Sequence, residues 1–168
     1  SDIMTPAAFH NAETVDMALG CSTNTMLHLP AIAHEAGLEF RLDEVNSISD
    51  RVPHLVKLNP AGQHCLVDMD RAGGLSGVML RLHQLGLIDA GARTVDGSWA
   101  DRLANAEIRD EDVIRDKENA YSQTGGLAVL YGNLAPEGAV VKKGAVLPGM
   151  LVHSGPARCF DSEESCCE

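Results

Sequence analysis

The part of the chain that most constrains its fold is residues 15–37, VDMALGCSTNTMLHLPAIAHEAG, where Gly20 separates two helical patterns. Apolar residues of the second pattern recur at helical spacing and predict one buried face: Met26, Leu29, Ala33 and Ala36. Ser22 is expected to cap this second helix and Gly37 to end it. Pro30 lies inside the helix and should kink it, because proline removes an intrahelical hydrogen bond.

Four small polar residues, STNT at positions 22–25, open this second helix. The N-terminus of a helix presents unpaired N–H groups, so a small anion could bind there. Capping alone is the simpler interpretation of the same residues, and the spacing by itself favours it.

The rest of the first hundred residues is predicted to be mostly helical. Thr5 and Pro6 should begin the first helix, and residues 42–52 should form a short amphipathic helix that ends before Pro53. Further elements are expected in this order: an extended link at 54–58, a turn at 59–62, a helix at 68–85 broken at 73–74, a turn at 93–97 and a capped helix at 98–106.

After residue 124 the pattern changes from helical to β. Residues that favour strands lie between glycine and proline turns at 127–131, 139–142 and 157–160. The charged stretch before them, 107–119, predicts an exposed connector in which Val113 and Ile114 touch a core. The sequence thus predicts an α/β fold in three parts: a helix-rich part at 1–106, a connector at 107–124 and the start of a β-rich part at 125–168.

The bulk charge limits the partners of the chain. Its 168 residues carry a formal net charge of −11, which argues against binding to nucleic acid or to an anionic membrane. No apolar run approaches the length of a spanning helix, and no signal peptide opens the sequence. A cytoplasmic protein is therefore expected.

Cysteines and histidines give no metal-binding pattern. The odd number and irregular spacing of the cysteines favour reduced thiols, and no CxxC pair occurs among Cys21, Cys65, Cys159, Cys166 and Cys167. Cys21 is interpreted as a small buried residue. The seven histidines have no partners at ligand spacing and are interpreted as surface or hydrogen-bonded residues. The Gly73-Gly74 and Gly125-Gly126 pairs are interpreted as turns or close backbone packing.

Four blocks of the sequence resemble the dihydroxy-acid/phosphogluconate dehydratase family. They are MALGCSTNTMLHLPAIAHEAG at 17–37, RAGG at 71–74, TGGLAVLYGNLAPEGAVVK at 124–142 and LVHSGPARCFDSEE at 151–164. The blocks follow the order and spacing of the family over nearly the whole chain. The amino-acid sequences of these blocks are most similar to those of the dihydroxy-acid dehydratases of branched-chain amino acid biosynthesis.

The resemblance implies a hydro-lyase that converts a small-molecule 2,3-dihydroxy acid to a 2-keto acid. It implies an iron–sulfur cluster that takes the departing hydroxyl, a Mg²⁺ ion held by carboxylates and a carboxylated lysine, and a serine alkoxide as the base. It further implies a homodimeric parent enzyme, in which residues 1–106 end an N-terminal α/β domain and residues 125–168 begin a β-barrel-like domain of the swivelling type.

The motifs that hold these groups in the family are missing from this sequence. The Cys-Asp-Lys motif, the Thr-Asp-Gly-Arg-Phe-Ser-Gly segment and the segment with the magnesium-binding glutamate do not occur. We therefore expect an internal fragment of a longer enzyme, inactive alone, with no catalytic residue, no metal ligand and no bound cofactor.

Resemblance and helix position together favour Ser22, Thr23 and Asn24 as the residues that approach the substrate. Their expected role is hydrogen bonding or positioning at the helix N-terminus. Two alternatives stay open: a fragment of a sugar-acid dehydratase acting on phosphogluconate or an aldonate, and a non-catalytic module that binds an anion.

Overall fold

The structure is a computed structural model that describes residues 2–168. It combines helices with two small antiparallel sheets, which fits a fragment of an α/β protein. In chain order the elements are α1 (Pro6–Leu19), α2 (Thr25–Glu35), α3 (Val45–Ser49), α4 (Leu66–Arg71), α5 (Gly74–Gln84), β1 (Arg93–Thr94), β2 (Gly97–Ser98), α6 (Trp99–Leu103), β3 (Ala128–Gly132), β4 (Ala135–Val141), the 3₁₀ turns Lys143–Ala145 and Pro148–Met150, and α7 (Glu163–Cys167).

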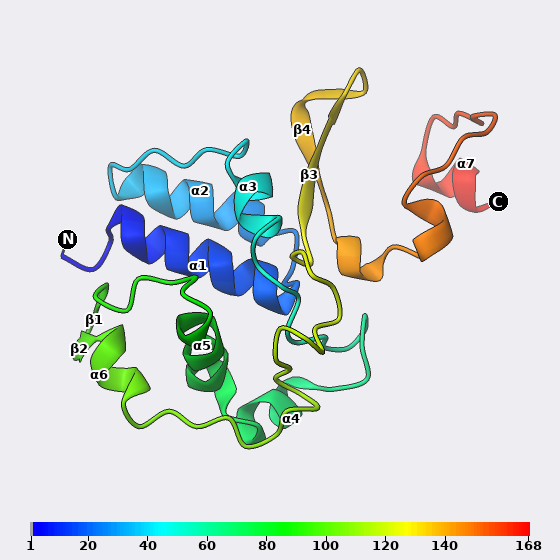
Figure 1. Cartoon of the computed structure of the whole chain (residues 1–168). Helices are drawn as coiled ribbons and strands as arrows, with labels where there is room; N and C mark the ends of the chain where they lie inside the picture. The colour runs from blue at the N-terminus through cyan, green and yellow to red at the C-terminus, as the bar shows by residue number, and fades with distance from the viewer. Residues whose placement is uncertain (1) are drawn as a thin grey trace.

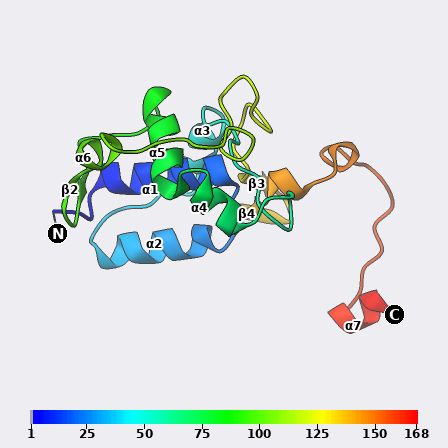
Figure 2. The same cartoon turned by 90° about the horizontal axis from the view of Figure 1, so that it is seen from below.

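Helix α1 is the centre of the helical part, with α2 on one side and α5 on the other (Figure 1; Figure 2). Thr5 Oγ1 accepts a hydrogen bond from the Ala8 N–H, and Pro6 is the first helical residue. Gly20 ends the helix in the left-handed region, at φ 53°. The predicted start of α1 and its glycine end are confirmed.

The core fills the space between α1, α3, α4 and α5. Its fully buried side chains come from α1, α3, α5, the extended segment 54–58, the connector and the residue before β3: Met17, Val45, Leu55, Val56, Val78, Leu82, Ile114 and Leu127. Val113 and Ile114 are 3% and 0% exposed, although most of the connector around them is solvated. The prediction that these two connector residues touch a core is confirmed, and Ile108 also packs against it.

Most predicted helices are present, with adjusted bounds. Gly37, at φ 72°, follows the last turn of α2 as predicted, but the helix begins at Thr25 with Asn24 in the cap position, so Ser22 as the cap was wrong. The helix expected at 42–52 covers only Val45–Ser49. Helices α4 and α5 are separated at Gly73 as predicted, and Ser98 caps α6 as predicted.

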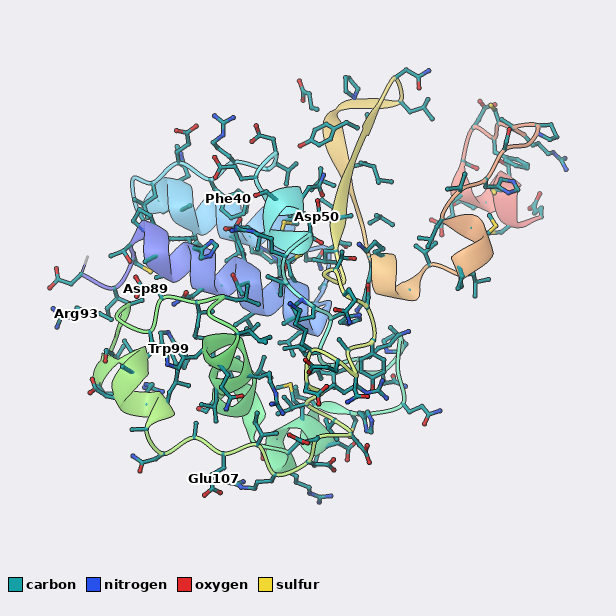
Figure 3. The ribbon with its side chains drawn as sticks, in the orientation of Figure 1. Phe40, Asp50, Asp89, Arg93, Trp99 and Glu107 are labelled. Atoms are coloured by element: carbon teal, nitrogen blue, oxygen red, sulfur yellow. The ribbon has the colours of Figure 1, made fainter. Side chains whose placement is uncertain are left out.

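Figure 3 shows how two aromatic side chains lie around the helical part. Trp99 lies between α6 and α5, and Phe40 lies in the loop between α2 and α3 (Figure 3). Phe40 is partly buried and packs against the core. Phe40 thus covers one edge of a core that is itself aliphatic.

The β-rich part is one hairpin followed by an exposed tail. Strands β3 and β4 pair antiparallel, with Ala128 opposite Val141 and Leu130 opposite Ala139. Every residue from 147 to 168 is exposed, and Figures 1 and 2 both show α7 apart from the helical part. The strand expected at 157–160 was wrong, because this segment pairs with no other strand within residues 2–168.

Candidate functional site

A pocket with a volume of about 530 Å³ lies where α1 ends. Its walls come from the loop after α1, the extended segment 54–61, α4 and the end of β4. The lining residues are mainly apolar, with a few polar or cationic groups among them: Leu19, Gly20, Cys21, Ser22, Thr23, His54, Lys57, Leu58, Asn59, Pro60, Ala61, Leu66, Met69 and Lys142.

A buried carboxyl group fixes the loop between α1 and α2. Thr25 Oγ1 donates to Asp16 Oδ2 at 2.7 Å, and the Cys21 N–H donates to the Asp16 carbonyl at 3.3 Å. Asp16 is 3% exposed, and burial raises the pKa of its carboxyl group, while the hydrogen bonds from Thr25 and Cys21 and the charge of Lys142 lower it. The first turn of α2 is thereby held beside the end of α1, and the loop opens into the pocket.

The structure separates the three residues that the sequence placed near a substrate. Ser22 and Thr23 line the pocket, whereas Asn24 does not and is exposed. Ser22 Oγ accepts a hydrogen bond from the Asn24 N–H at 3.2 Å, and no side-chain cap bond from Asn24 forms. Ser22 thus orders the loop without being the N-cap.

The extended segment 54–58 forms the opposite wall. Leu55 and Val56 both donate their N–H groups to the Ala18 carbonyl, at 2.9 and 3.1 Å. The His54 N–H donates to the Ser122 carbonyl at 2.9 Å, and the Tyr121 N–H donates to the His54 carbonyl at 2.9 Å. These bonds tie the end of α1, this segment and the connector together, as the predicted extended link allows.

His54 lines the pocket and is buried, so its interpretation as a surface residue was wrong, whereas a hydrogen-bonded residue was the other alternative. Its side chain is 3% exposed, and Nε2 has no hydrogen-bond partner of good geometry. Three glycines enclose the ring: a Cβ on Gly20 would come within 2.7 Å of Nε2, one on Gly126 within 3.3 Å of Nε2, and one on Gly144 within 2.8 Å of Cε1. Close backbone packing, predicted for Gly125-Gly126, is confirmed by this arrangement.

Burial lowers the pKa of His54, and the positive charges of Lys57 and Lys142 lower it further, against the opposing effect of the Leu19 and Val56 backbone. The imidazole is therefore neutral at pH 7.

Three of the four lysines of this acidic chain gather around the site. Lys57 and Lys142 line the main pocket and also an adjoining hollow of about 350 Å³. Lys143 lies in a further hollow of about 360 Å³, where its Nζ donates to Thr124 Oγ1 at 2.6 Å. The ion pairs found within residues 2–168 all use arginines, so none of them neutralises Lys57 or Lys142.

The cysteines do not converge. Cys21 is partly buried, and burial followed by the nearby Asp16 raises the pKa of its thiol to about 12, which keeps it protonated. Cys65, Cys159, Cys166 and Cys167 are exposed. The interpretation of Cys21 as a small buried residue was partly wrong, since the residue also lines the pocket.

Within residues 2–168, no three His, Cys, Asp or Glu side chains are grouped as a metal site requires. An iron–sulfur cluster needs several cysteine thiolates together, and Mg²⁺ needs converging oxygen ligands. The described residues of this chain fit neither group.

Sequence reasoning missed His54, Lys57 and Lys142 because they meet only through the fold. Two signals were present in the sequence: lysines are few, and His54 and Lys57 border a short apolar run between Pro53 and the 59–62 turn. Neither signal says that residue 142 lies beside residue 57.

Comparison with known proteins identifies the family. Residues 1–103 match the family model for the N-terminal domain of dihydroxy-acid/6-phosphogluconate dehydratases, and residues 112–168 match the C-terminal one. These matches define the class: a segment that joins the two domains of such a dehydratase. The chain belongs to the dihydroxy-acid/6-phosphogluconate dehydratase family, as its sequence blocks indicated.

Individual relatives agree with this assignment. The chain is similar to a dihydroxy-acid dehydratase of Acetivibrio thermocellus, at 57% identity over 100% of this chain and 30% of the relative. It is also similar to the dihydroxy-acid dehydratases of Desulfatibacillum aliphaticivorans, at 58% identity over 98% of this chain, and of Moorella thermoacetica, at 59% over 97%, again with 30% of each relative covered. The chain spans about 30% of the length of the curated relatives it matches. None of the helices within residues 2–168 has both the length and the apolar character needed to span a bilayer.

Proposed function

We propose that this chain is part of a dihydroxy-acid dehydratase, a hydro-lyase that removes water from 2,3-dihydroxy acids to give 2-keto acids in valine and isoleucine biosynthesis. One observation carries the proposal: relatives with that name are 57–59% identical to the chain over almost all of it. The iron–sulfur cluster and Mg²⁺ would be held by segments of the parent enzyme outside this chain.

The organisation of the parent follows from the same proposal. Residues 1–106 would form the end of its N-terminal α/β domain, and residues 125–168 would begin a β-barrel-like domain of the swivelling type. Residues 107–124 would connect the two domains. The adjoining family matches at 1–103 and 112–168 support a division near this connector. The parent would be a cytoplasmic homodimer.

Ser22, Thr23 and Asn24 would act on the substrate by hydrogen bonding or positioning. The pocket supports this role for Ser22 and Thr23, which line it. Asn24 would act from the exposed side of the same loop, through its side-chain amide on the substrate.

The test uses the full-length parent, or a chimera in which these 168 residues replace the matching segment of the Acetivibrio thermocellus dehydratase. A panel of dihydroxyisovalerate, gluconate and phosphogluconate decides the substrate class. Turnover of dihydroxyisovalerate is expected, and turnover of only the sugar acids would replace the proposal by a sugar-acid dehydratase.

The three loop residues are tested one at a time as Ser22→Ala, Thr23→Val and Asn24→Ala. Each is expected to lower kcat/KM by roughly tenfold or more with iron content unchanged, because each removes a side-chain hydrogen bond to the substrate or, for Ser22, to the loop. The matched control is Asn105→Ala, which changes an exposed residue after α6. Unchanged kcat/KM in all three variants, with intact iron content, would end this assignment.

A further inference from the structure

The turn between β1 and β2 contains the only aspartate of the sequence that is followed by glycine, Asp96. Residues 95–96 form a two-residue loop, in which Thr94 lies opposite Gly97. Val95 is 84% exposed and the Asp96 side chain is 62% exposed, so water reaches this turn. The turn lies at the edge of the helical part, away from the β3–β4 hairpin (Figure 1). The proposed function assigns it no role.

An aspartate followed by glycine can react with its own backbone. The amide nitrogen of Gly97 can attack Cγ of Asp96, because the two groups belong to adjacent residues and close a five-membered ring. Glycine also has no Cβ that would crowd the attacking nitrogen. The turn requires glycine here: Gly97 has φ 145°, and a Cβ on it would lie 2.9 Å from Asp101 Oδ2.

The reaction at Asp96 consumes no reagent other than water. The bond between the Gly97 nitrogen and Asp96 Cγ forms, and a Cγ–O bond of the neutral carboxylic acid breaks. The departing hydroxyl takes the proton of the amide nitrogen and leaves as water. Water then opens the cyclic imide at one of its two carbonyl groups. Opening at Cγ restores aspartate, whereas opening at the main-chain carbonyl gives isoaspartate, in which the main chain runs through Cγ.

Two neighbouring side chains oppose this reaction in the folded chain. Arg102 Nε and Nη2 donate to Asp96 Oδ1 at 3.0 and 2.6 Å, and Thr94 Oγ1 donates to the same oxygen at 2.9 Å. The bond from Arg102 first, and then that from Thr94, lower the pKa of the Asp96 carboxyl group, so little of the reactive neutral acid is present. Ring closure also moves the carboxyl group towards the backbone, which these three bonds resist.

We propose that Asp96 is a site of covalent modification, at which isoaspartate forms spontaneously and the guanidinium group of Arg102 sets the rate. Formation is slow while the ion pair holds and becomes faster when the pair is lost. The modification is a property of this turn and does not depend on the reaction of the parent enzyme.

Isoaspartate would change the structure next to the turn. It adds one carbon to the main chain of a two-residue loop, so Thr94 and Gly97 can no longer lie opposite each other as they do now. The Trp99 N–H, which donates to the Ala92 carbonyl at 3.1 Å just beyond the hairpin, is expected to lose this bond. Faster hydrogen exchange at the Trp99 amide in the purified isoaspartyl form measures it, and unchanged exchange there would contradict this consequence.

Isoaspartate that accumulates in the 168-residue chain at neutral pH tests the rate. Mass spectrometry of digested samples quantifies it at residue 96. Arg102→Gln is expected to form it roughly fivefold faster or more, because the carboxyl group loses its charged partner and the neutral fraction rises. The matched control is Arg109→Gln, which removes an exposed ion pair with Glu107 and should keep the wild-type rate. Equal rates in wild type and Arg102→Gln would overturn the proposal.

The same chains unfolded in urea separate the effect of the fold from that of the local sequence. Without the ion pair, wild type and Arg102→Gln should react at one common rate, faster than folded wild type. A folded wild type that reacts as fast as the unfolded chain would also overturn the proposal.

Two further variants keep the test decisive if Arg102→Gln disturbs α6. Thr94→Val removes only the neutral hydrogen bond to Asp96 Oδ1 and should raise the rate by a smaller factor than Arg102→Gln. Asp96→Glu should abolish the product, because the corresponding six-membered ring closes far more slowly. Isoaspartate that persists in the same digestion fragment of Asp96→Glu would place the modification at another aspartate and contradict the assignment.

Discussion

Two buried carboxyl groups, Glu13 and Asp16, lie one turn apart on α1. Glu13 is 9% exposed, and its pKa is raised from 4.5 to about 7 by burial first, then by the charges of Glu44 and Asp16. Charged neighbours in the hollow around it include Glu44, Arg41 and Arg51. The folded chain therefore binds a proton at Glu13 more tightly than the unfolded chain does.

This carboxyl group should make stability depend on pH. Because the folded-state pKa of Glu13 lies above its ordinary value, its contribution to the free energy of unfolding is complete below pH 4.5 and is lost as the pH rises to about 7. Glu13→Gln is expected to reduce the loss of stability between pH 5 and pH 8 by on the order of 1 kcal/mol, after allowance for solvent screening. Urea unfolding at the two pH values measures it.

The control for Glu13 is Glu35→Gln, which changes an exposed carboxyl group on α2. It should keep the pH dependence of the wild type. If Glu13→Gln also keeps that dependence, the carboxyl group of Glu13 ionises in the folded chain at its ordinary pKa.

At the level of single residues, the sequence predicts contacts between a side chain and nearby backbone groups. It does not predict which residues from distant segments meet. Thr5, Gly20, Gly37 and Ser98 cap or end helices as predicted, because each acts on backbone groups a few residues away. His54 was misjudged because three glycines from distant segments enclose it. Such an enclosure has no periodicity that a sequence pattern could reveal.

At the level of elements, helix α3 acts as an edge partner for strand β3. Asn46 Nδ2 donates to the Val129 carbonyl at 2.8 Å, and the Val129 N–H donates to Asn46 Oδ1 at 2.8 Å. One turn later, Ser49 Oγ donates to the Leu127 carbonyl at 2.7 Å. Two side chains of a helix thus supply the hydrogen bonds that a neighbouring strand would supply, and they join the hairpin to the helical part.

Removing the Asn46 amide should loosen this joint. Asn46→Ala leaves the Val129 N–H and carbonyl without partners, and Val129 is only 3% exposed. We expect a loss of about 1–3 kcal/mol in the free energy of unfolding, the usual cost of an unpaired buried polar group. Faster hydrogen exchange at the Val129 amide is the specific readout.

Ser47→Ala is the matched control, because Ser47 lies on the exposed side of α3 and donates only to the Glu44 carbonyl. It should leave exchange at Val129 unchanged. Unaltered protection of Val129 in Asn46→Ala would mean that β4 alone orders this strand.

The joint between α3 and β3 also explains which elements the sequence predicted. Helix periodicity located α4, α5 and α6, whose patterns are local. The segment at 157–160 has a strand pattern but no partner within residues 2–168, and a strand forms only where a partner or a core completes it. No sequence pattern indicates that the side chain of Asn46 pairs with a strand.

At the level of the whole molecule, large apolar side chains are exposed on α2, on α4, on the β3–β4 hairpin and along the tail, among other places. The clearest cases are Leu27 at 69%, Leu134 at 97% and Val152 at 91% exposed. The chain spans about 30% of its curated relatives, so these surfaces are where further segments of the proposed parent would pack. The core described above is complete without them.

The tail should therefore contribute nothing to the stability of this chain. Residues 153–168 are all exposed, and their hydrogen bonds and ring contact lie within the tail itself. A chain shortened to residues 1–152 is expected to keep the urea midpoint of the full chain and the same hydrogen exchange in α1 and β3. A chain shortened to 1–126 is the contrasting variant: it removes Leu127 and Val129, which are 0% and 3% exposed, and should lose about 3–5 kcal/mol. An earlier midpoint for the 1–152 chain would show that the tail packs on the body in solution, in which case the exposed apolar residues of the hairpin and α2 are its first candidate contacts.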